Sequence, residues 1–175
     1  MGEQLSEAPD RHRNEWVVLA LLAEAPAHGF ALARELSAEA DLGRILTVRR
    51  PLVYRALDRL VADDAAEAGH REPGRAGPTR TVHRVTGSGR HQLDRWLATP
   101  AAHVRDLRVD FLVKLRLLER AGRDPAPLVV AQRAALAETF ERLTDRTDAT
   151  VGDVVDRWRA HNAAAMRTFL DQIVA

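Results

Sequence analysis

The chain has 175 residues, 46% of them hydrophobic and 29% charged, so it can bury a core as one medium domain or two small ones. Aromatic residues make up only 5%, which argues against an all-β sandwich or barrel. There is no cysteine, which excludes a disulfide framework, a thiolate zinc site and a cysteine nucleophile.

The polar segment 1–14 carries no apolar stretch of the signal-peptide type, and the longest apolar run, 16–23, is too short to span a membrane. We therefore expect a cytoplasmic protein with no membrane partner.

A first helix is predicted over 15–25, with Asn14 as its cap. A second helix is predicted over 30–40 and ends before Gly43.

A third helix should follow, with Thr47 or Arg50 near its cap and Pro51 in its first turn, where a missing N–H costs nothing. Its buried stripe is predicted to consist of apolar residues, namely Leu52, Val53, Ala56, Leu57, Leu60 and Val61. Segments 65–72 and 79–85 have the pattern of two strands around a tip rich in glycine and proline. Together they predict a two-stranded hairpin.

The rest of the chain is predicted to be helical, over 89–97, 106–120, 128–146 and 152–174. Thr99-Pro100 interrupts this pattern and sets the expected boundary between domains 1–100 and 101–175. The last helices are long and amphipathic, and a small region cannot easily bury all their apolar faces alone, which favours a homodimer over a monomeric antiparallel bundle. The residues expected at the dimer contact are Leu136, Phe140, Leu143, Trp158, Phe169, Leu170 and Ile173.

The basic residues are unevenly distributed, although the net charge is only +1. Residues 44–59 hold five arginines against one acid, and residues 68–91 hold five more against one. A solvated arginine-rich surface would give the same pattern, but such blocks also fit a local anionic partner. Three helices followed by a basic hairpin are the order of a winged helix-turn-helix, in which one helix enters the major groove.

The expected fold is therefore mostly α: an N-terminal winged helix-turn-helix with a small two-stranded wing, and a C-terminal helical dimerisation region. Its partner is expected to be double-stranded DNA, because arginine forks match guanine edges and phosphates. The third helix contributes the candidate DNA-binding residues Arg49, Arg50, Leu52, Tyr54, Arg55 and Arg59. The hairpin contributes Arg71, Arg75 and Arg80.

Several segments resemble the PadR family of bacterial transcription regulators. They are residues 18–23, the turn PAHGF at 26–30, the helix RPLVYRALDRL at 50–60, the strand and helix start RTVHRVTGSG at 80–89, and FLVKL at 111–115. The resemblance covers most of the chain and fits the longer type of the family. The chain departs from the family at Asp64-Ala65, where Gly-Leu is usual, at His83, where an aromatic residue is usual, and at Arg49, where a small hydroxyl residue often stands.

The resemblance implies a repressor, less often an activator, that binds an inverted-repeat operator as a homodimer. Many relatives respond to a small aromatic or drug-like effector near the dimer interface. Trp16, Trp96, Trp158 and His161 are the residues this chain offers for such a pocket, although a core or interface position for each tryptophan and a helix-surface position for His161 are the stronger interpretations.

We expect no enzyme, because the sequence has no nucleophile motif, no phosphate loop and no zinc-protease motif. No cofactor, catalytic residue or metal ligand is assigned, and His83 with His91 makes only a weak metal pair. Two alternatives remain: a protein-interaction module whose basic segments are incidental, and an effector sensor without operator binding. Salt-dependent binding of duplex DNA distinguishes them from a regulator.

Overall fold

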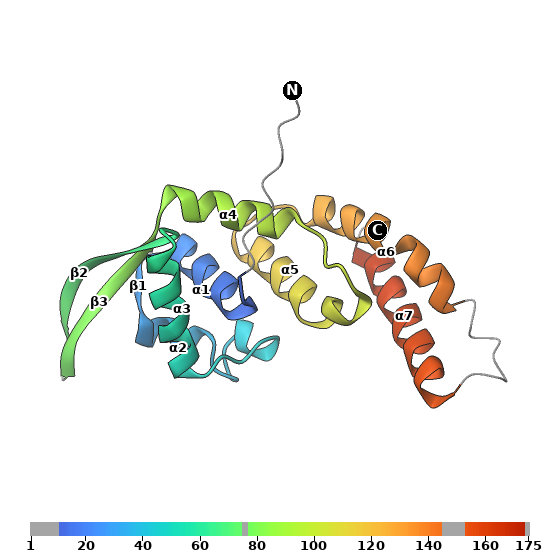
Figure 1. Cartoon of the computed structure of the whole chain (residues 1–175), viewed down its shortest axis with the longest axis horizontal. Coiled ribbons are helices and arrows are strands. Elements are labelled where there is room, and N and C mark those ends of the chain that lie inside the picture. Colours follow the sequence, from blue (N-terminus) through green and yellow to red (C-terminus); the bar gives the residue numbers. More distant parts are fainter. Residues whose placement is uncertain (1–10, 75–76, 145–152, 174–175) are drawn as a thin grey trace, which may run out of the picture. The chain divides into compact units, whose positions relative to one another are not determined.

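The computed structural model describes residues 11–74, 77–144 and 153–173, and the chain divides into two compact units, residues 1–96 and 97–175 (Figure 1). The predicted fold class is confirmed, since helices dominate and a small antiparallel sheet lies in the first unit. The first unit contains α1 Arg13–Glu24, β1 Ala27–His28, α2 Gly29–Glu35, the 3-10 turn η1 Leu42–Arg44, α3 Arg50–Ala62, β2 Ala66–Gly74, β3 Gly77–Val85 and most of α4 Gly87–Ala98. The second contains the 3-10 turn η2 Val104–Arg108, α5 Asp110–Arg120, α6 Ala126–Thr144 and α7 Val154–Ile173.

Helix α1 is the centre of the first unit. It is buried along every face of its middle turns, from Trp16 to Leu22, as expected of a helix that is apolar all round. It packs against α3 and β3, while α2 covers a further part of α3. The three helices of the winged motif thus share one core, from which α3 presents only its other face to solvent.

The wing is a three-stranded antiparallel sheet in the order β1-β3-β2. The predicted hairpin is confirmed, but β1 adds a third strand through the pairs Ala27↔His83 and His28↔Val82. Two residues are too few to show a strand period, so the sequence could not reveal this strand. The hairpin is also longer than predicted, since its strands pair as far as Gly74↔Gly77.

Three predicted helix boundaries in the first unit were wrong. Asn14 lies inside α1, which begins after His12 with no side-chain cap. Helix α2 ends at Glu35, well before Gly43, where a Cβ atom would lie 1.5 Å from the Ser37 carbonyl oxygen; glycine is required there for a close backbone approach. Thr47 does not cap α3 but donates a hydrogen bond to the Gly43 carbonyl at 2.9 Å.

The end of α3 is fixed to the start of α4. Asp64 has the left-handed φ of 53°, and the N–H of Ala65 donates to the Leu60 carbonyl at 2.9 Å, which together make a Schellman cap. The Thr86 hydroxyl donates to the Asp64 carbonyl at 2.7 Å and accepts the Gly89 N–H at 2.9 Å. Thr86 is therefore the capping residue of α4, and it connects that helix to the end of α3.

In the second unit, two buried side chains hold the segment that follows α4. Gln132 accepts the N–H of Ala101 at 2.6 Å and donates to its carbonyl at 2.9 Å. Lys114 donates to the Thr99 carbonyl at 2.6 Å, and burial lowers the pKa of Lys114 to about 8.

The helix predicted from residue 106 instead begins with η2, and α5 starts only at Asp110. None of the helices that the structure describes combines the length and apolar character needed to cross a membrane.

Candidate nucleic-acid interface

Helix α3 has one buried and one exposed face. Pro51 occupies its first turn, and the residues that face the core are Val53, Ala56, Leu57 and Leu60. Leu52 and Val61, which were predicted to be buried, are 37% and 38% exposed, because the core side of the helix is narrower than the apolar pattern. Tyr54 is 41% exposed, and Arg55 lies next to it on the solvent side.

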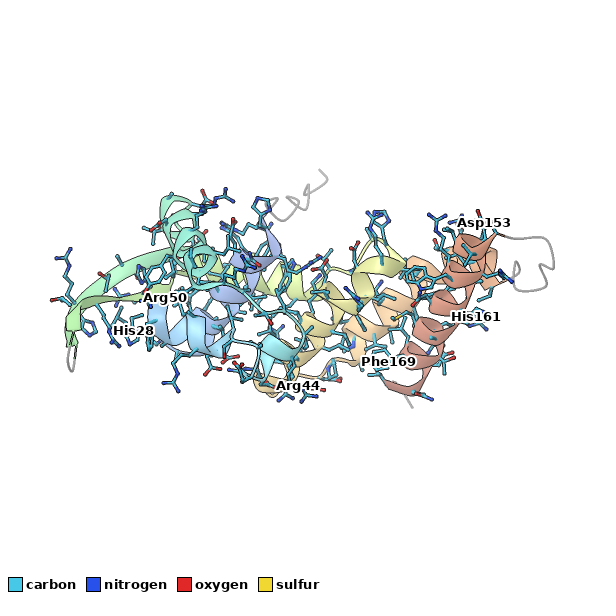
Figure 2. All side chains as sticks on the ribbon, turned by 90° about the horizontal axis from the view of Figure 1, so that it is seen from below. His28, Arg44, Arg50, Asp153, His161 and Phe169 are labelled. Atoms are coloured by element: carbon cyan, nitrogen blue, oxygen red, sulfur yellow. The ribbon has the colours of Figure 1, made fainter. Side chains whose placement is uncertain are left out.

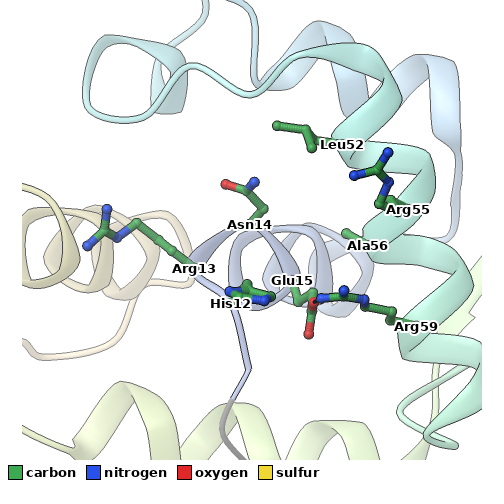
Figure 3. Close-up of a pocket in the computed structure, with 8 residues that line it drawn as sticks. All are labelled: His12, Arg13, Asn14, Glu15, Leu52, Arg55, Ala56 and Arg59. Carbon is green, nitrogen blue, oxygen red and sulfur yellow. Dashed lines mark hydrogen bonds and ion pairs between the residues drawn. The ribbon is translucent and has the colours of Figure 1, made fainter.

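Arg55 and Arg59 have different surroundings, although both come from α3. The Arg59 guanidinium lies 2.8 Å from the Glu15 carboxylate, so much of its charge is neutralised within the chain (Figure 3). Arg55 forms no hydrogen bond or ion pair with any residue that the structure describes. Of the two predicted DNA-binding arginines, Arg55 is the one whose donors are available to a partner.

Glu15 belongs to a polar network that the sequence analysis missed. Arg11, whose side chain is almost fully buried, lies 3.9 Å from Glu15 and 2.9 Å from Asp63, and it donates to Gln92 at 2.7 Å. The network connects α1, the end of α3 and α4. The only sequence signal for it was an acid in the first turn of an otherwise apolar helix.

A cavity of about 350 Å³ lies between the first turn of α1 and the outer face of α3 (Figure 3). Its walls are formed by His12, Arg13, Asn14, Glu15, Leu52, Arg55, Ala56 and Arg59, so they include three arginines as well as apolar surface. The exposed face of α3 is therefore continuous with a hollow to which Arg55 and Arg59 both contribute.

At the first turn of α3, two guanidiniums lie over one aromatic ring. The Arg50 Cζ atom lies 5.2 Å from the centroid of Phe30, and the Arg80 Cζ atom of β3 lies 5.1 Å from the same centroid. Arg50 also lies 5.7 Å from the centroid of Tyr54. Sequence analysis identified both arginines and Tyr54 but not Phe30, whose only signal was its place in the His-Gly-Phe turn.

His28, which Figure 2 labels together with Arg50, and Gly29 contact members of this cluster. The Nδ1 atom of His28 accepts the N–H of Ala31 at 3.0 Å, so the proton of the neutral ring is on Nε2. Nε2 lies 3.4 Å from the Arg80 Nη1 atom, which makes this a contact between two donors. A Cβ atom on Gly29 would lie 2.7 Å from the Tyr54 ring, so glycine is required for Tyr54 to lie here.

The wing carries the remaining candidates. Arg71 is exposed on β2, opposite Thr81 of β3. Arg75 lies outside the described residues. Arg84 is not available to a partner in the same way, because the Glu67 carboxylate lies 2.7 Å from its guanidinium. Arg49 is exposed, in an extended conformation immediately before α3.

His83 lies in the middle strand of the wing sheet. Burial lowers the pKa of His83, and its Nδ1 atom has no hydrogen-bond partner among the described residues. A phenylalanine at this position would have neither a titrating group nor a buried nitrogen without a hydrogen-bond partner. Within the described part of the chain, no group of three or more histidine or carboxylate side chains could hold a metal ion.

The residues proposed for an effector pocket fall in both units. Trp16 and Trp96 of the first unit stack with centroids 5.3 Å apart and an interplanar angle of 8°. Trp16 is buried, and the Arg11 guanidinium lies 5.7 Å from its ring centroid. Trp158 and His161 are exposed on α7 in the second unit.

The predicted dimer contacts divide into buried and exposed residues. Leu136, Phe140 and Leu170 are buried within the single chain, where α6 packs against α7, so they are core residues rather than part of an exposed face. Leu143 and Ile173 are partly exposed. Trp158 is 66% exposed and Phe169 38% exposed, and Val154 and Val155 extend their face toward the start of α7.

Comparison with known proteins identifies one family. Residues 18–95 match the model of the transcriptional regulator PadR-like family, which confirms the resemblance over that part of the chain. A crystal structure of Bacillus subtilis PadR in complex with operator DNA is similar at 13% identity, covering 94% of this chain and 99% of that chain, with a TM-score of 0.49. No curated protein matches the sequence.

Two further solved structures are similar. For smu.1604c from Streptococcus mutans UA159 the identity is 14%, with 92% of this chain and 98% of that chain covered and a TM-score of 0.47. For the PadR-like transcriptional regulator BC1756 from Bacillus cereus the identity is 18%, the coverages are 95% and 97%, and the TM-score is 0.43. All three TM-scores are below 0.5, so the similarity to the PadR-like family rests on the sequence match over residues 18–95.

Proposed function

Because residues 18–95 carry the sequence pattern of the PadR-like transcriptional regulators, we propose that this chain binds a specific duplex operator and represses transcription from it. The observation that carries the proposal is the exposed face of α3. It presents Arg55, which has no hydrogen-bond or ion-pair partner among the described residues, beside the half-exposed Tyr54, on a helix whose other face is buried in the core. Such a helix can enter a major groove, where an arginine fork reads guanine.

We propose that the first hundred residues bind DNA and that residues 101–175 join two copies. The support for pairing is the exposed apolar face of α7. Trp158 and Phe169 are three turns apart and lie within about 20° of each other around the helix. A second copy would cover both side chains, and a two-fold dimer matches an inverted-repeat operator. A mass measurement at micromolar concentration should give twice 19.4 kDa, and a monomer would contradict this part.

A small aromatic or drug-like effector that releases the operator is the remaining part of the proposal. Its support is the family resemblance. The stacked Trp16 and Trp96 give an intrinsic fluorescence signal for a screen of such compounds. An effector should change this signal and lower operator affinity at the same concentrations, and a compound that does only the first is not one.

The test of operator binding is fluorescence anisotropy with labelled duplexes. Purified protein is titrated into its own upstream intergenic DNA and into a scrambled duplex, each at about 50 and 200 mM salt. We expect the upstream DNA to be preferred on the order of 1000-fold, with a steep loss of affinity at higher salt. Equal affinity for both duplexes would contradict sequence-specific binding. No binding at either salt concentration would favour an interaction or ligand-sensing module.

A further inference from the structure

We propose that Arg50 and Arg80, held on the ring of Phe30, form a site for the backbone phosphate of one DNA strand, with Phe30 as its positioning residue. The inference rests on the proposed function and names the contact by which the chain is held on its operator. It brings together three elements of the first unit: α2, the start of α3 and the middle strand of the wing.

The first argument is the way in which the two arginines are held. A cation–π contact with an aromatic ring holds a guanidinium without neutralising its charge, which remains for an anionic partner. Neither Arg50 nor Arg80 forms an ion pair with a carboxylate among the described residues. Arg59 and Arg84, in contrast, are paired with Glu15 and Glu67 at 2.8 and 2.7 Å.

The second argument is that the Arg50 and Arg80 guanidiniums repel each other, because both carry a positive charge near the same ring. Both guanidiniums lie within 5.2 Å of one ring centroid, so their Cζ atoms are at most about 10 Å apart. The His28 Nε2 atom, which carries the proton of the neutral ring because Nδ1 accepts the Ala31 N–H, lies 3.4 Å from the Arg80 Nη1 atom. An anionic oxygen between His28 and Arg80 would accept hydrogen bonds from both side chains. Its negative charge would also offset the repulsion between the Arg50 and Arg80 guanidiniums.

The third argument is the backbone that supports the ring. Gly29 leaves room for Tyr54, whose ring lies beneath the Arg50 guanidinium at 5.7 Å. Phe30 itself is 37% exposed, so part of its side chain stays accessible to a partner. Two guanidiniums cover it here, and a sugar-phosphate chain would cover the rest.

The experiment compares four test variants and one control variant on the operator. Arg50→Ala and Arg80→Ala should each lower affinity about 10-fold on specific and scrambled duplexes alike, and should reduce the salt slope by about one counterion. Phe30→Leu should lower affinity without changing the salt slope, because both charges remain. Phe30→Tyr keeps the ring and should bind as the wild type does. Arg34→Ala, which removes an exposed arginine from the same α2 helix, is the matched control and should have no effect.

A duplex series with single methylphosphonate substitutions identifies the phosphate. On the duplex whose contacted phosphate is neutral, wild-type affinity should fall to that of Arg80→Ala on unmodified DNA, and Arg80→Ala should lose nothing further. Additive losses at every position would overturn the proposal, as would wild-type binding by Phe30→Leu with an unchanged melting temperature. If wild-type protein fails to bind any duplex, the proposed function is contradicted as well, so the two failures are distinguishable.

Discussion

The exposed face of α3 and the exposed face of α7 differ in the kind of side chain that is left without a partner in the part of the chain that the structure describes: arginines on α3 and large apolar residues on α7. On α3 and the neighbouring wing, Arg50, Arg55 and Arg80 have no carboxylate partner within the described residues. On α7, four large apolar side chains are exposed, namely Val154, Val155, Trp158 and Phe169, with Trp158 66% and Val154 69% exposed. The α3 surface is complementary to an anion, and the α7 surface is complementary to another apolar surface. The exposed side chains of each helix therefore indicate the chemistry of its partner.

The strongest way to break this comparison is to place a charge on the apolar face. Trp158→Glu should weaken self-association by about 3 kcal/mol, which is more than 100-fold, because it removes a large aromatic anchor and leaves a carboxylate in the contact. Sedimentation equilibrium would measure it. Arg167→Ala, about 180° around the same helix, is the control and should leave the dimer intact. A dimer unaffected by Trp158→Glu would show that α7 does not form the contact.

A second change tests whether the second unit depends on its buried polar group. Gln132→Leu removes both hydrogen bonds to Ala101 and leaves a buried N–H and a buried carbonyl without partners. We expect the free energy of unfolding to fall by about 3 kcal/mol in urea, followed by circular dichroism. Arg133→Ala breaks only the exposed ion pair with Asp171 at 2.9 Å and should cost less than about 1 kcal/mol. Equal losses for the two variants would contradict this account.

A smaller effect is expected at the end of α3. Asp64 occupies a left-handed conformation with a φ of 53°, which favours glycine. Asp64→Gly should raise the free energy of unfolding by about 0.5–1 kcal/mol, because relief of strain exceeds the added entropy of the unfolded chain. Asp63→Gly should instead destabilise, since Asp63 accepts from Arg11 at 2.9 Å. A destabilising Asp64→Gly would show that the aspartate has a role beyond the cap.

The smallest effect concerns the pH dependence of the wing. Burial lowers the pKa of His83 below its ordinary value of 6.5, so the unfolded chain takes up this proton first as the pH falls. Stability that is present above pH 6.5 should therefore be lost progressively toward the lower pKa of the folded chain. His83→Phe should remove this part of the acid loss, which parallel thermal melts from pH 7.5 to about 4.5 would measure. Identical profiles for the two proteins would contradict the assignment.

The elements that the sequence predicted correctly are those whose apolar periodicity extends over many residues. The apolar periods of α1, α3 and the C-terminal helices run over many residues, and their types and order were correct. Strand β1 has two residues and no period, and the end of α2 depends on the approach of Gly43 to the Ser37 carbonyl, which only the folded backbone creates. Apolar periodicity also could not separate the exposed Trp158 from the buried Leu136, because both lie on amphipathic helices.

The candidate site was predicted in part for a similar reason. The arginines are visible as residue types, but pairing decides which of them remain available. Glu15 lies 44 positions before Arg59, and no local pattern connects them. Phe30 has its place beneath Arg50 and Arg80 only because α2, α3 and β3 meet there.

The central claim is that α3 reads bases, and the specificity of Arg55→Ala tests it most directly. Operator and scrambled duplexes are titrated with wild type and with Arg55→Ala by fluorescence anisotropy at one salt concentration. We predict a loss of about 1–3 kcal/mol on the operator and little change on the scrambled duplex, because a base contact is lost. Equal losses on both duplexes would mean that Arg55 contacts only phosphate, and would contradict the assignment of α3 as the reading helix.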